Sequence, residues 1–340
     1  MSRRYVVIGA GGVGAALAAG LTEASIPVVL VSRGRTFDAV AREGLRFTHE
    51  GRTRTLDVPI VGSPSDLELR SSDVLVLAVK SQDAAEALAA WARHPVADGG
   101  IAATELPVVT LQNGLDAERT ALRHFDTVLG GAALIAAQHV VAGEVTVRNG
   151  PKLGQIILGP FPSAALAADA ASLVPDVAAD LRRGGWLVHE TNDPRRWKAW
   201  KAVTAATFPV EVLSGTPEEL DEVRQRIRDE ARHVLGAAGY EFADYAEVSY
   251  DPTLAQVRKD PSDGPAGLST WQSFVRGSSS EADFLTGEIV LQARLLGLPS
   301  PVSSAVQRAL AEAAAAGEKP GVRSARSLLE SLVEPSGVPA

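Results

Sequence analysis

The chain opens with an apolar segment that leads directly into a cluster of glycines. Residues 5–14 read YVVIGAGGVG, and a second apolar segment follows at 27–31. A continuous apolar run bounded by turn residues is typical of a strand buried on both faces of a parallel sheet. The G-x-G-x-x-G spacing predicts a strand, a tight turn and a helix over 13–22, which is the unit that binds a dinucleotide.

Each glycine of this motif has a distinct physical role. Gly9 allows the tight turn, Gly11 lets the backbone approach a pyrophosphate, and Gly14 lets the helix pack closely on its strand. The first amides of the helix add partial positive charge at the phosphates. The predicted phosphate-binding residues are therefore Gly9, Ala10, Gly11, Gly12, Val13 and Gly14.

The rest of the first half alternates strand and helix patterns. Buried strands are predicted at 73–79 and 108–111, with a helix at 83–93 between them. Strands at 45–49 and 54–60 predict an antiparallel insertion, and those at 145–147 and 155–158 predict edge strands of the main sheet. This alternation predicts an α/β fold with a doubly wound, Rossmann-type NADP-binding domain over 1–187.

From about residue 186 only helical patterns remain. They predict an all-α substrate and catalytic domain over 188–334, with Asp193-Pro194 and a capping box at 216–219 marking two helix starts. A loop around one short helix is expected at 251–267. The predicted helices cover 193–212, 216–238, 270–276, 281–296, 303–315 and 322–332.

The end of the second strand bears on the choice of dinucleotide. An NAD site usually places a carboxylate there for the ribose 2′-hydroxyl, whereas this chain has Ser32 and Arg33, with Arg35 just beyond. A guanidinium can bind a 2′-phosphate with two hydrogen bonds and stack on adenine. The alternative is a solvated arginine at a strand end. The position favours NADPH as the cofactor.

Composition removes several classes of function. The 340 residues carry a net charge of −8 and no cysteine. We therefore expect no nucleic acid or membrane partner, no disulfide and no thiolate metal site or nucleophile. The six histidines are scattered without metal-ligand spacing, so each is expected to be structural and no metal is expected. A homodimer is compatible with this composition.

The first 25 residues superficially resemble a secretory signal, with two arginines and an apolar run. Cleavage there would remove the glycine loop and leave the second strand without its partner. No apolar stretch is long enough to span a bilayer; the best, at 128–141, is too short and contains His139. These features predict a soluble, cytoplasmic protein whose substrate is a small molecule.

Lysine is rare, with 27 arginines and six lysines, so the surviving lysines are candidates for roles that need proton release. Lys80 ends a predicted buried strand. Lys198 and Lys201 share a face of a predicted helix, where burial would lower a lysine pKa and make it a usable general acid. The alternative is a pair of solvent-facing lysines whose stems cover apolar surface.

Asn113 ends another predicted buried strand, in VTLQNG. Ligands of open α/β sheets bind at the carboxyl ends of strands. An amide side chain both donates and accepts hydrogen bonds, which suits a bridge between a nicotinamide ribose and a substrate oxygen. Asn-Gly is also a strong turn former, and the residues alone leave both interpretations open.

With these segments assembled, the chain resembles the ketopantoate reductase family over almost its full length. The similarity rests on GAGGVG at 9–14, VKSQ at 79–82, LQNGLD at 111–116 and STWQSFVRGSSSEADFLTGEIV at 269–290. The last block is the most specific, and the helical segment 196–215 resembles the family's catalytic-lysine helix. The matching residues of the last block are Ser269, Gln272, Glu281, Asp283 and Gly287.

The resemblance implies NADPH-dependent reduction of ketopantoate, or of a related 2-oxo acid, in pantothenate biosynthesis. It implies that Lys201 is the general acid and that Glu281 contacts the nicotinamide side of the cofactor and orients the lysine. The remaining implied roles are substrate binding by Ser269 and Asn113, adenosine-end binding by Lys80 and Arg33, and a backbone contact to the cofactor at Ala137.

The chain also departs from the family pattern. The family's substrate asparagines correspond here to Thr204-Ala205, Phe208-Pro209 and Glu218, which predicts a less polar pocket. Two alternatives follow: a reductase of a bulkier ketone or imine in secondary metabolism, and a non-catalytic NADPH-binding regulatory protein. Retention of Lys201 together with Glu281 argues against the second alternative, since a regulator needs neither.

Overall fold

The computed structural model describes residues 3–258, 267, 269–277 and 281–333, and it forms two compact units. The first unit comprises residues 1–112, 116–198 and 243–264, and the second comprises 113–115, 199–242 and 265–340. The units are therefore not divided at a single position of the chain. A short loop within the first half belongs to the second unit, and a later segment returns to the first.

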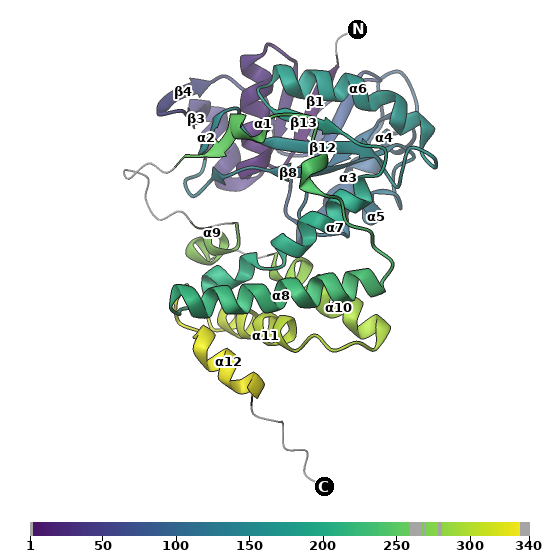
Figure 1. Cartoon of the computed structure of the whole chain (residues 1–340). Helices are drawn as coiled ribbons and strands as arrows, with labels where there is room; N and C mark the ends of the chain where they lie inside the picture. The colour runs from purple at the N-terminus through teal and green to yellow at the C-terminus, as the bar shows by residue number, and fades with distance from the viewer. Residues whose placement is uncertain (1–2, 259–266, 268, 278–280, 334–340) are drawn as a thin grey trace. The chain divides into compact units, whose positions relative to one another are not determined.

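The first unit is built on an eight-stranded sheet in the order β13-β12-β8-β7-β6-β1-β2-β5 (Figure 1). All neighbouring strands are parallel except β12 and β8, which are antiparallel. The strands are β1 (Arg4–Ile8), β2 (Val28–Val31), β5 (Ile60–Val61), β6 (Asp73–Leu77), β7 (Val108–Thr110), β8 (Val128–Leu134), β12 (Gln155–Pro160) and β13 (Leu187–Glu190).

Helices cover both faces of this sheet, which explains why its strands read as continuous apolar runs. Tyr5 and Val7 of β1 pack in a core with helices α1 (Gly12–Glu23) and α6 (Ala168–Arg183). Val6 and Ile8 pack in a separate core with α3 (Ser81–Ala92) and α5 (Ala117–Ala121). The doubly wound fold is confirmed. Two further helices are α2 (Gly34–Glu43) and α4 (Ala102–Glu105).

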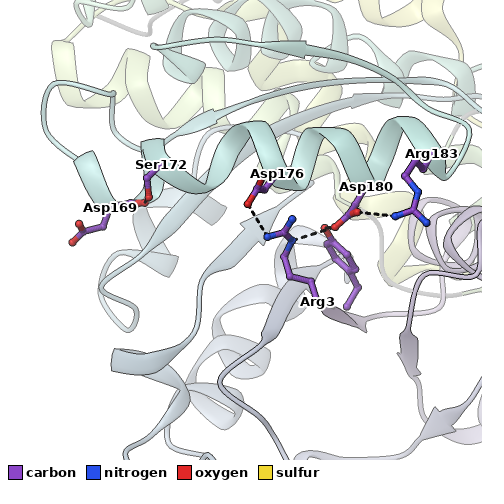
Figure 2. Close-up of polar contacts among 7 residues, drawn as sticks. Arg3, Asp169, Ser172, Asp176, Asp180 and Arg183 are labelled. Carbon is purple, nitrogen blue, oxygen red and sulfur yellow. Dashed lines mark hydrogen bonds and ion pairs between the residues drawn. The ribbon is translucent and has the colours of Figure 1, made fainter. Parts of the chain in front are cut away.

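A polar cluster holds α6 against the amino end of β1 (Figure 2). Arg3 donates to Asp176 at 2.9 Å and to Asp180 at 3.2 Å. The hydroxyl of Tyr5 donates to Asp180 at 2.9 Å, and burial raises the pKa of Tyr5. The sequence pattern did not predict α6, which is rich in alanine and contains Pro175.

A smaller sheet, in the order β4-β3-β10-β9, contains the predicted antiparallel insertion. The predicted edge positions are wrong: 145–147 lies in this second sheet, paired with β3, and 155–158 is an interior part of the main sheet. Apolar segments this short do not specify which strand they pair with. The strands are β3 (Leu45–His49), β4 (Arg52–Leu56), β9 (Ala137–Gln138) and β10 (Glu144–Val147), with a separate pair β11 (Asn149–Pro151) and β14 (Ala255–Val257).

The second unit is helical and has its own apolar core. The predicted capping box is present: Glu219 N donates to Thr216 Oγ1, and Thr216 N donates to Glu219. The latter bond lowers the pKa of Glu219. The main elements are α7 (Pro194–Ala205), which begins in the first unit, η2 (Phe208–Val212), α8 (Pro217–Ala237), α9 (Ser269–Arg276), η5 (Ala282–Phe284), α10 (Thr286–Leu296), α11 (Pro301–Ala315) and α12 (Ala325–Val333).

Several predicted boundaries are wrong. The helix predicted over 193–212 ends at Ala205, because Thr207 Oγ1 donates to the Thr204 carbonyl and Pro209 has no amide hydrogen to continue it. Residues 187–190, in the region expected to be helical, form β13, and β8 was not anticipated.

The predicted loop at 251–267 contains η4 (Pro252–Leu254) and β14, while residues 259–266 lie outside the described part of the chain. Two further short helices are η1 (Pro64–Asp66) and η3 (Tyr245–Glu247). Within the described ranges, no helix has both the length and the apolar character needed to cross a bilayer.

Candidate active site

Four adjacent parallel strands of the first unit end at the same edge of the sheet. The order β7-β6-β1-β2 places the glycine loop after β1 between the segment ending in Lys80 and the segment that carries Ser32 and Arg33. The chain leaves β1 toward β2 on one side and reaches β6 on the other. That is the topological switch point at which open α/β sheets bind ligands.

The glycine loop, residues 9–14, is called the cradle below. It has one glycine, Gly11, beside which no other segment of the protein packs. A Cβ atom built at Gly9, where φ is 114°, would lie 2.6 Å from the Val79 amide nitrogen, and one at Gly14 would overlap the Gly9 carbonyl oxygen. A Cβ at Gly12 would lie 3.0 Å from the Cβ of Ala137, whereas at Gly11 no atom lies within 4 Å. The protein's own packing therefore requires Gly9 and Gly14. The space beside Gly11 is open, and the binding of a pyrophosphate there stays a prediction.

The neighbouring residues of the loop are placed by the first unit itself. Ala10 is buried in the core, and Val13 lies in the first turn of α1. Ala137 lies in β9, and the Asn149 amide fixes the chain beside it. Asn149 accepts from Ala136 N at 2.7 Å and donates to the Ala255 carbonyl at 2.7 Å. The contact between Gly12 and Ala137 thus brings together two segments predicted to bind one cofactor.

Arg33 lies two residues after the end of β2 and occupies the N-cap position of α2. Its side chain is 70% exposed and forms a 3.5 Å ion pair with Glu86, which is 78% exposed. Exposed pairs of this length contribute little to stability. Ser32 is half-buried beside it, and Lys80 takes the N-cap position of α3.

Lys198 is not a solvent-facing lysine. It is 3% exposed, and its Nζ donates to the Gln112 carbonyl at 2.6 Å and to Glu118 at 2.7 Å, with the Gly131 carbonyl at 3.4 Å. Glu118 is 1% exposed and also accepts from the Thr110 hydroxyl at 2.8 Å. Sequence reasoning missed Glu118 and Gln112. Their pairing with Lys198 joins distant segments, and no local pattern signals it.

The second unit contains the loop that carries Asn113. Gly114 has φ 83°, and a Cβ there would lie 2.6 Å from the Phe284 carbonyl oxygen, so the turn interpretation of Asn-Gly is correct for the glycine. Leu115 packs into the core of the second unit together with Ala282. Residues 113–115 therefore lie against the turn that follows Glu281, which is 7% exposed.

Ser269 begins α9, and its hydroxyl oxygen is buried with no hydrogen-bond partner among the described residues. The helix is tied to η2, since the Trp271 amide donates to Glu211 at 3.1 Å. The end of the α7 segment is tied to α10, because Thr286 Oγ1 donates to the Ala206 carbonyl at 2.6 Å. A buried hydroxyl without a protein partner is suited to receive a ligand atom.

Lys201 lies on α7, three residues after Lys198, and is half-buried. The positions that depart from the family pattern differ in environment. Ala205 is fully buried, Phe208 begins η2, and Glu218 is exposed in the first turn of α8. A carboxylate at a helix N-terminus is stabilised by the helix dipole. The helix dipole therefore accounts for a carboxylate at position 218 without a ligand.

Two family models match the chain in succession. The model described as Ketopantoate reductase PanE/ApbA matches residues 5–163, and the corresponding C-terminal model matches residues 197–314. The chain belongs to the ketopantoate reductase family. Members of this family are oxidoreductases that act on a carbonyl or hydroxyl group, so this chain is one too.

Individual relatives are distant. The chain is 27% identical over 316 residues to a 2-dehydropantoate 2-reductase of Archaeoglobus fulgidus, covering 88% of this chain and 94% of the relative. A 2-dehydropantoate 2-reductase of Pyrococcus horikoshii is 25% identical over 308 residues, covering 88% and 94%.

Solved structures show the same fold at lower identity. A ketopantoate reductase of Ralstonia eutropha JMP134 superposes with a TM-score of 0.72 at 21% identity, covering 92% of this chain and 99% of that one. A D-mandelate dehydrogenase, in a ternary structure with NADH and anilino(oxo)acetate, gives a TM-score of 0.72 at 18% identity, covering 96% and 99%.

Proposed function

We propose that this protein is an NADPH-dependent reductase of a 2-oxo acid, either ketopantoate or a related carbonyl compound. The observation that carries the proposal is the cradle at the carboxyl edge of the sheet. It is open at Gly11, and the next strand, β2, is followed by Ser32 and Arg33, where a carboxylate would serve NADH. When bound, NADPH supplies the hydride.

In this proposal the first unit holds the cofactor and the second carries the proton donor. The glycine-loop amides bind the pyrophosphate, while Ser32, Arg33 and Lys80 bind the adenosine end. The backbone at Ala137 borders the cofactor. Asn113 and Glu281 contact the nicotinamide side. The domain roles predicted for 1–187 and 188–334 are part of the same proposal.

Lys201 is the proposed donor of the proton to the carbonyl oxygen. Lys198, on the same helix, directs its ammonium at three acceptors of the protein, and the resemblance to the family assigns the catalytic lysine to Lys201. The buried carboxylate of Glu281 orients Lys201. Ser269, whose hydroxyl has no partner among the described residues, and Asn113 hold the substrate.

The departures at Ala205 and Phe208 favour a larger or less polar substrate than ketopantoate. Each lost hydrogen bond to a charged ligand weakens binding by roughly 1.5–3 kcal/mol. The D-mandelate dehydrogenase structure is named with an oxoacetate that carries an anilino group, so this fold accommodates a 2-oxo acid of that kind. A reductase of a bulkier ketone or imine is the second candidate, and Phe208 is the observation that favours it.

A panel of carbonyl compounds, followed by NADPH absorbance, tests the proposal. The panel contains ketopantoate, 2-oxo acids with branched or aromatic side chains, and neutral ketones and imines. We expect measurable but poor reduction of ketopantoate and faster reduction of a larger 2-oxo acid. Tight NADPH binding without turnover of any compound would contradict the proposal and favour a regulatory protein.

A further inference from the structure

The pair formed by Lys198 and Glu118 has no role in the proposed proton transfer, yet it is among the most buried charged groups of the first unit. Glu118 is 1% exposed and Lys198 is 3% exposed. Burying two charges in this way is often no more stable than an apolar pair of similar volume. Stability alone therefore does not explain the pair.

Lys198 contacts two main-chain carbonyls, and the longer contact, at 3.4 Å, goes to Gly131. Its shortest hydrogen bond, at 2.6 Å, goes to the carbonyl of Gln112, the residue immediately before Asn113. Glu118 fixes the ammonium from the other side at 2.7 Å, and the Thr110 hydroxyl fixes Glu118. A compact ammonium with three donors fits this set of acceptors better than the planar fork of an arginine.

Gln112 extends the network along the edge of the sheet. Its side-chain amide donates to the carbonyls of Leu77 at 2.8 Å and Val79 at 2.9 Å. The main chain of Gln112 is thus held by Lys198, while its side chain spans the ends of β7 and β6. Val79 directly precedes Lys80, so both strand ends predicted to contact the cofactor are fixed by one residue.

We propose that Lys198 and Glu118 are positioning residues that clamp the Gln112 carbonyl and thereby set the orientation of the Asn113 loop. Lys198 acts through the main chain and not as a proton donor. The consequence for turnover rests on the proposed function. The consequence for the conformation of the loop does not.

The test compares two double variants. Lys198→Met/Glu118→Met removes the clamp without leaving a buried unpaired charge, so its Tm is expected to stay near that of the wild type. The matched control is Arg4→Met/Asp73→Met, which removes a partly buried ion pair, with bonds of 2.9 and 2.6 Å, at the amino ends of β1 and β6. Hydrogen exchange of residues 111–116, kcat, and the dissociation constant of NADPH are measured for both variants.

For the Lys198→Met/Glu118→Met variant we expect faster exchange in residues 111–116 and a kcat lowered by about tenfold to a hundredfold, as for a misplaced catalytic group. The NADPH dissociation constant changes by less than about threefold, because the glycine loop still binds the phosphates. The pH profile of kcat keeps its shape. The control pair changes neither loop exchange nor kcat.

Unchanged exchange in the loop, or wild-type kcat in the folded double variant, would overturn the proposal. A changed pH profile would also overturn it, since that would make Lys198 the titrating donor. If the double variant does not fold, Glu118→Gln decides in its place: it weakens the hold on the Lys198 ammonium, so exchange in residues 111–116 should rise, and exchange at the wild-type rate overturns the proposal. A wild-type protein that reduces no carbonyl compound defeats the proposed function but leaves the exchange result standing.

Discussion

In the first unit, the groups expected to hold the cofactor are largely main-chain amides, with Gly9 and Gly14 fixed by contacts of the protein itself. In the second unit, the expected groups are side chains: Lys201, Ser269 and Glu281. A binding loop made of backbone amides requires glycine at particular positions, so few substitutions are tolerated there. A site made of side chains can change its substrate specificity through single substitutions. Family models match segments of both units, and the positions expected to depart from the family pattern, Ala205 and Phe208, lie in the second unit.

The largest expected effect is on proton transfer. Lys201→Ala should lower kcat by about two to four orders of magnitude, the usual contribution of a positioned acid, while the NADPH dissociation constant stays unchanged. Lys201→Arg should be equally slow, because a guanidinium does not release its proton. Lys319→Ala, at an exposed lysine, is the control. Steady-state kinetics with full activity in Lys201→Ala would remove this residue from the mechanism.

Two glycine variants separate folding from binding in the first unit. Gly11→Ala places a methyl group where no protein atom lies within 4 Å, so Tm should be unchanged while NADPH affinity falls at least about tenfold, or 1.4 kcal/mol. Gly14→Ala should lower Tm, because its Cβ overlaps the Gly9 carbonyl. Calorimetry and fluorescence titration measure both. Gly236→Ala, in an open position of α8, is the control. NADPH affinity retained in Gly11→Ala would refute the cradle.

The second unit offers the complementary change. Phe208→Asn should restore a hydrogen-bonding group at a position where the family pattern has asparagine, and so raise kcat/KM for ketopantoate by about tenfold. The same variant should lose activity on an aromatic 2-oxo acid, and Phe208→Leu controls for the loss of the ring alone. A wild-type enzyme already fast on ketopantoate with a micromolar Michaelis constant would show that the pocket has not changed.

The smallest expected effect is on stability against pH. Burial lowers the pKa of His49 and of His189 in the folded protein. His189 Nδ1 also accepts the Ser249 amide at 3.1 Å, which requires the unprotonated nitrogen. As pH falls, these histidines therefore bind protons at a higher pH in the unfolded chain than in the folded protein. The contribution of these residues is complete above pH 6.5 or so and is lost as pH falls through the lower folded values. The fall in Tm from neutral to mildly acidic pH should be smaller in His189→Gln.

The sequence predicted the parts of the molecule in which local pattern and environment agree. The strand, glycine turn and helix at 5–22 form one contiguous unit, and the Thr216 capping box is local by nature. The sequence pattern predicted the wrong structure where a segment's conformation depends on contacts outside that segment. The segment at 145–147 pairs with β3 instead of the main sheet, and the helix over 193–212 breaks before Pro209.

The same distinction holds within the candidate site. The cradle residues are neighbours in sequence, and the Asn-Gly turn is visible in two residues. The partners of Lys198 were not visible, because Glu118 reads as one more charged residue of a surface helix until the fold brings it within 2.7 Å of the ammonium. Side chains that meet across long separations in sequence cannot be paired from periodicity.

The most direct measurement is the affinity of the wild-type protein and of Arg33→Ala for NADPH and NADH, by fluorescence titration at one salt concentration. Arg33 stands where an NADH site usually has a carboxylate, and among the described residues only the weak pair with Glu86 competes for it. We expect NADPH to bind the wild type at least about tenfold more tightly than NADH, a difference of 1.4 kcal/mol, and Arg33→Ala to lose most of that preference. Equal affinities in the wild type would contradict the assignment of the sheet edge as an NADPH site.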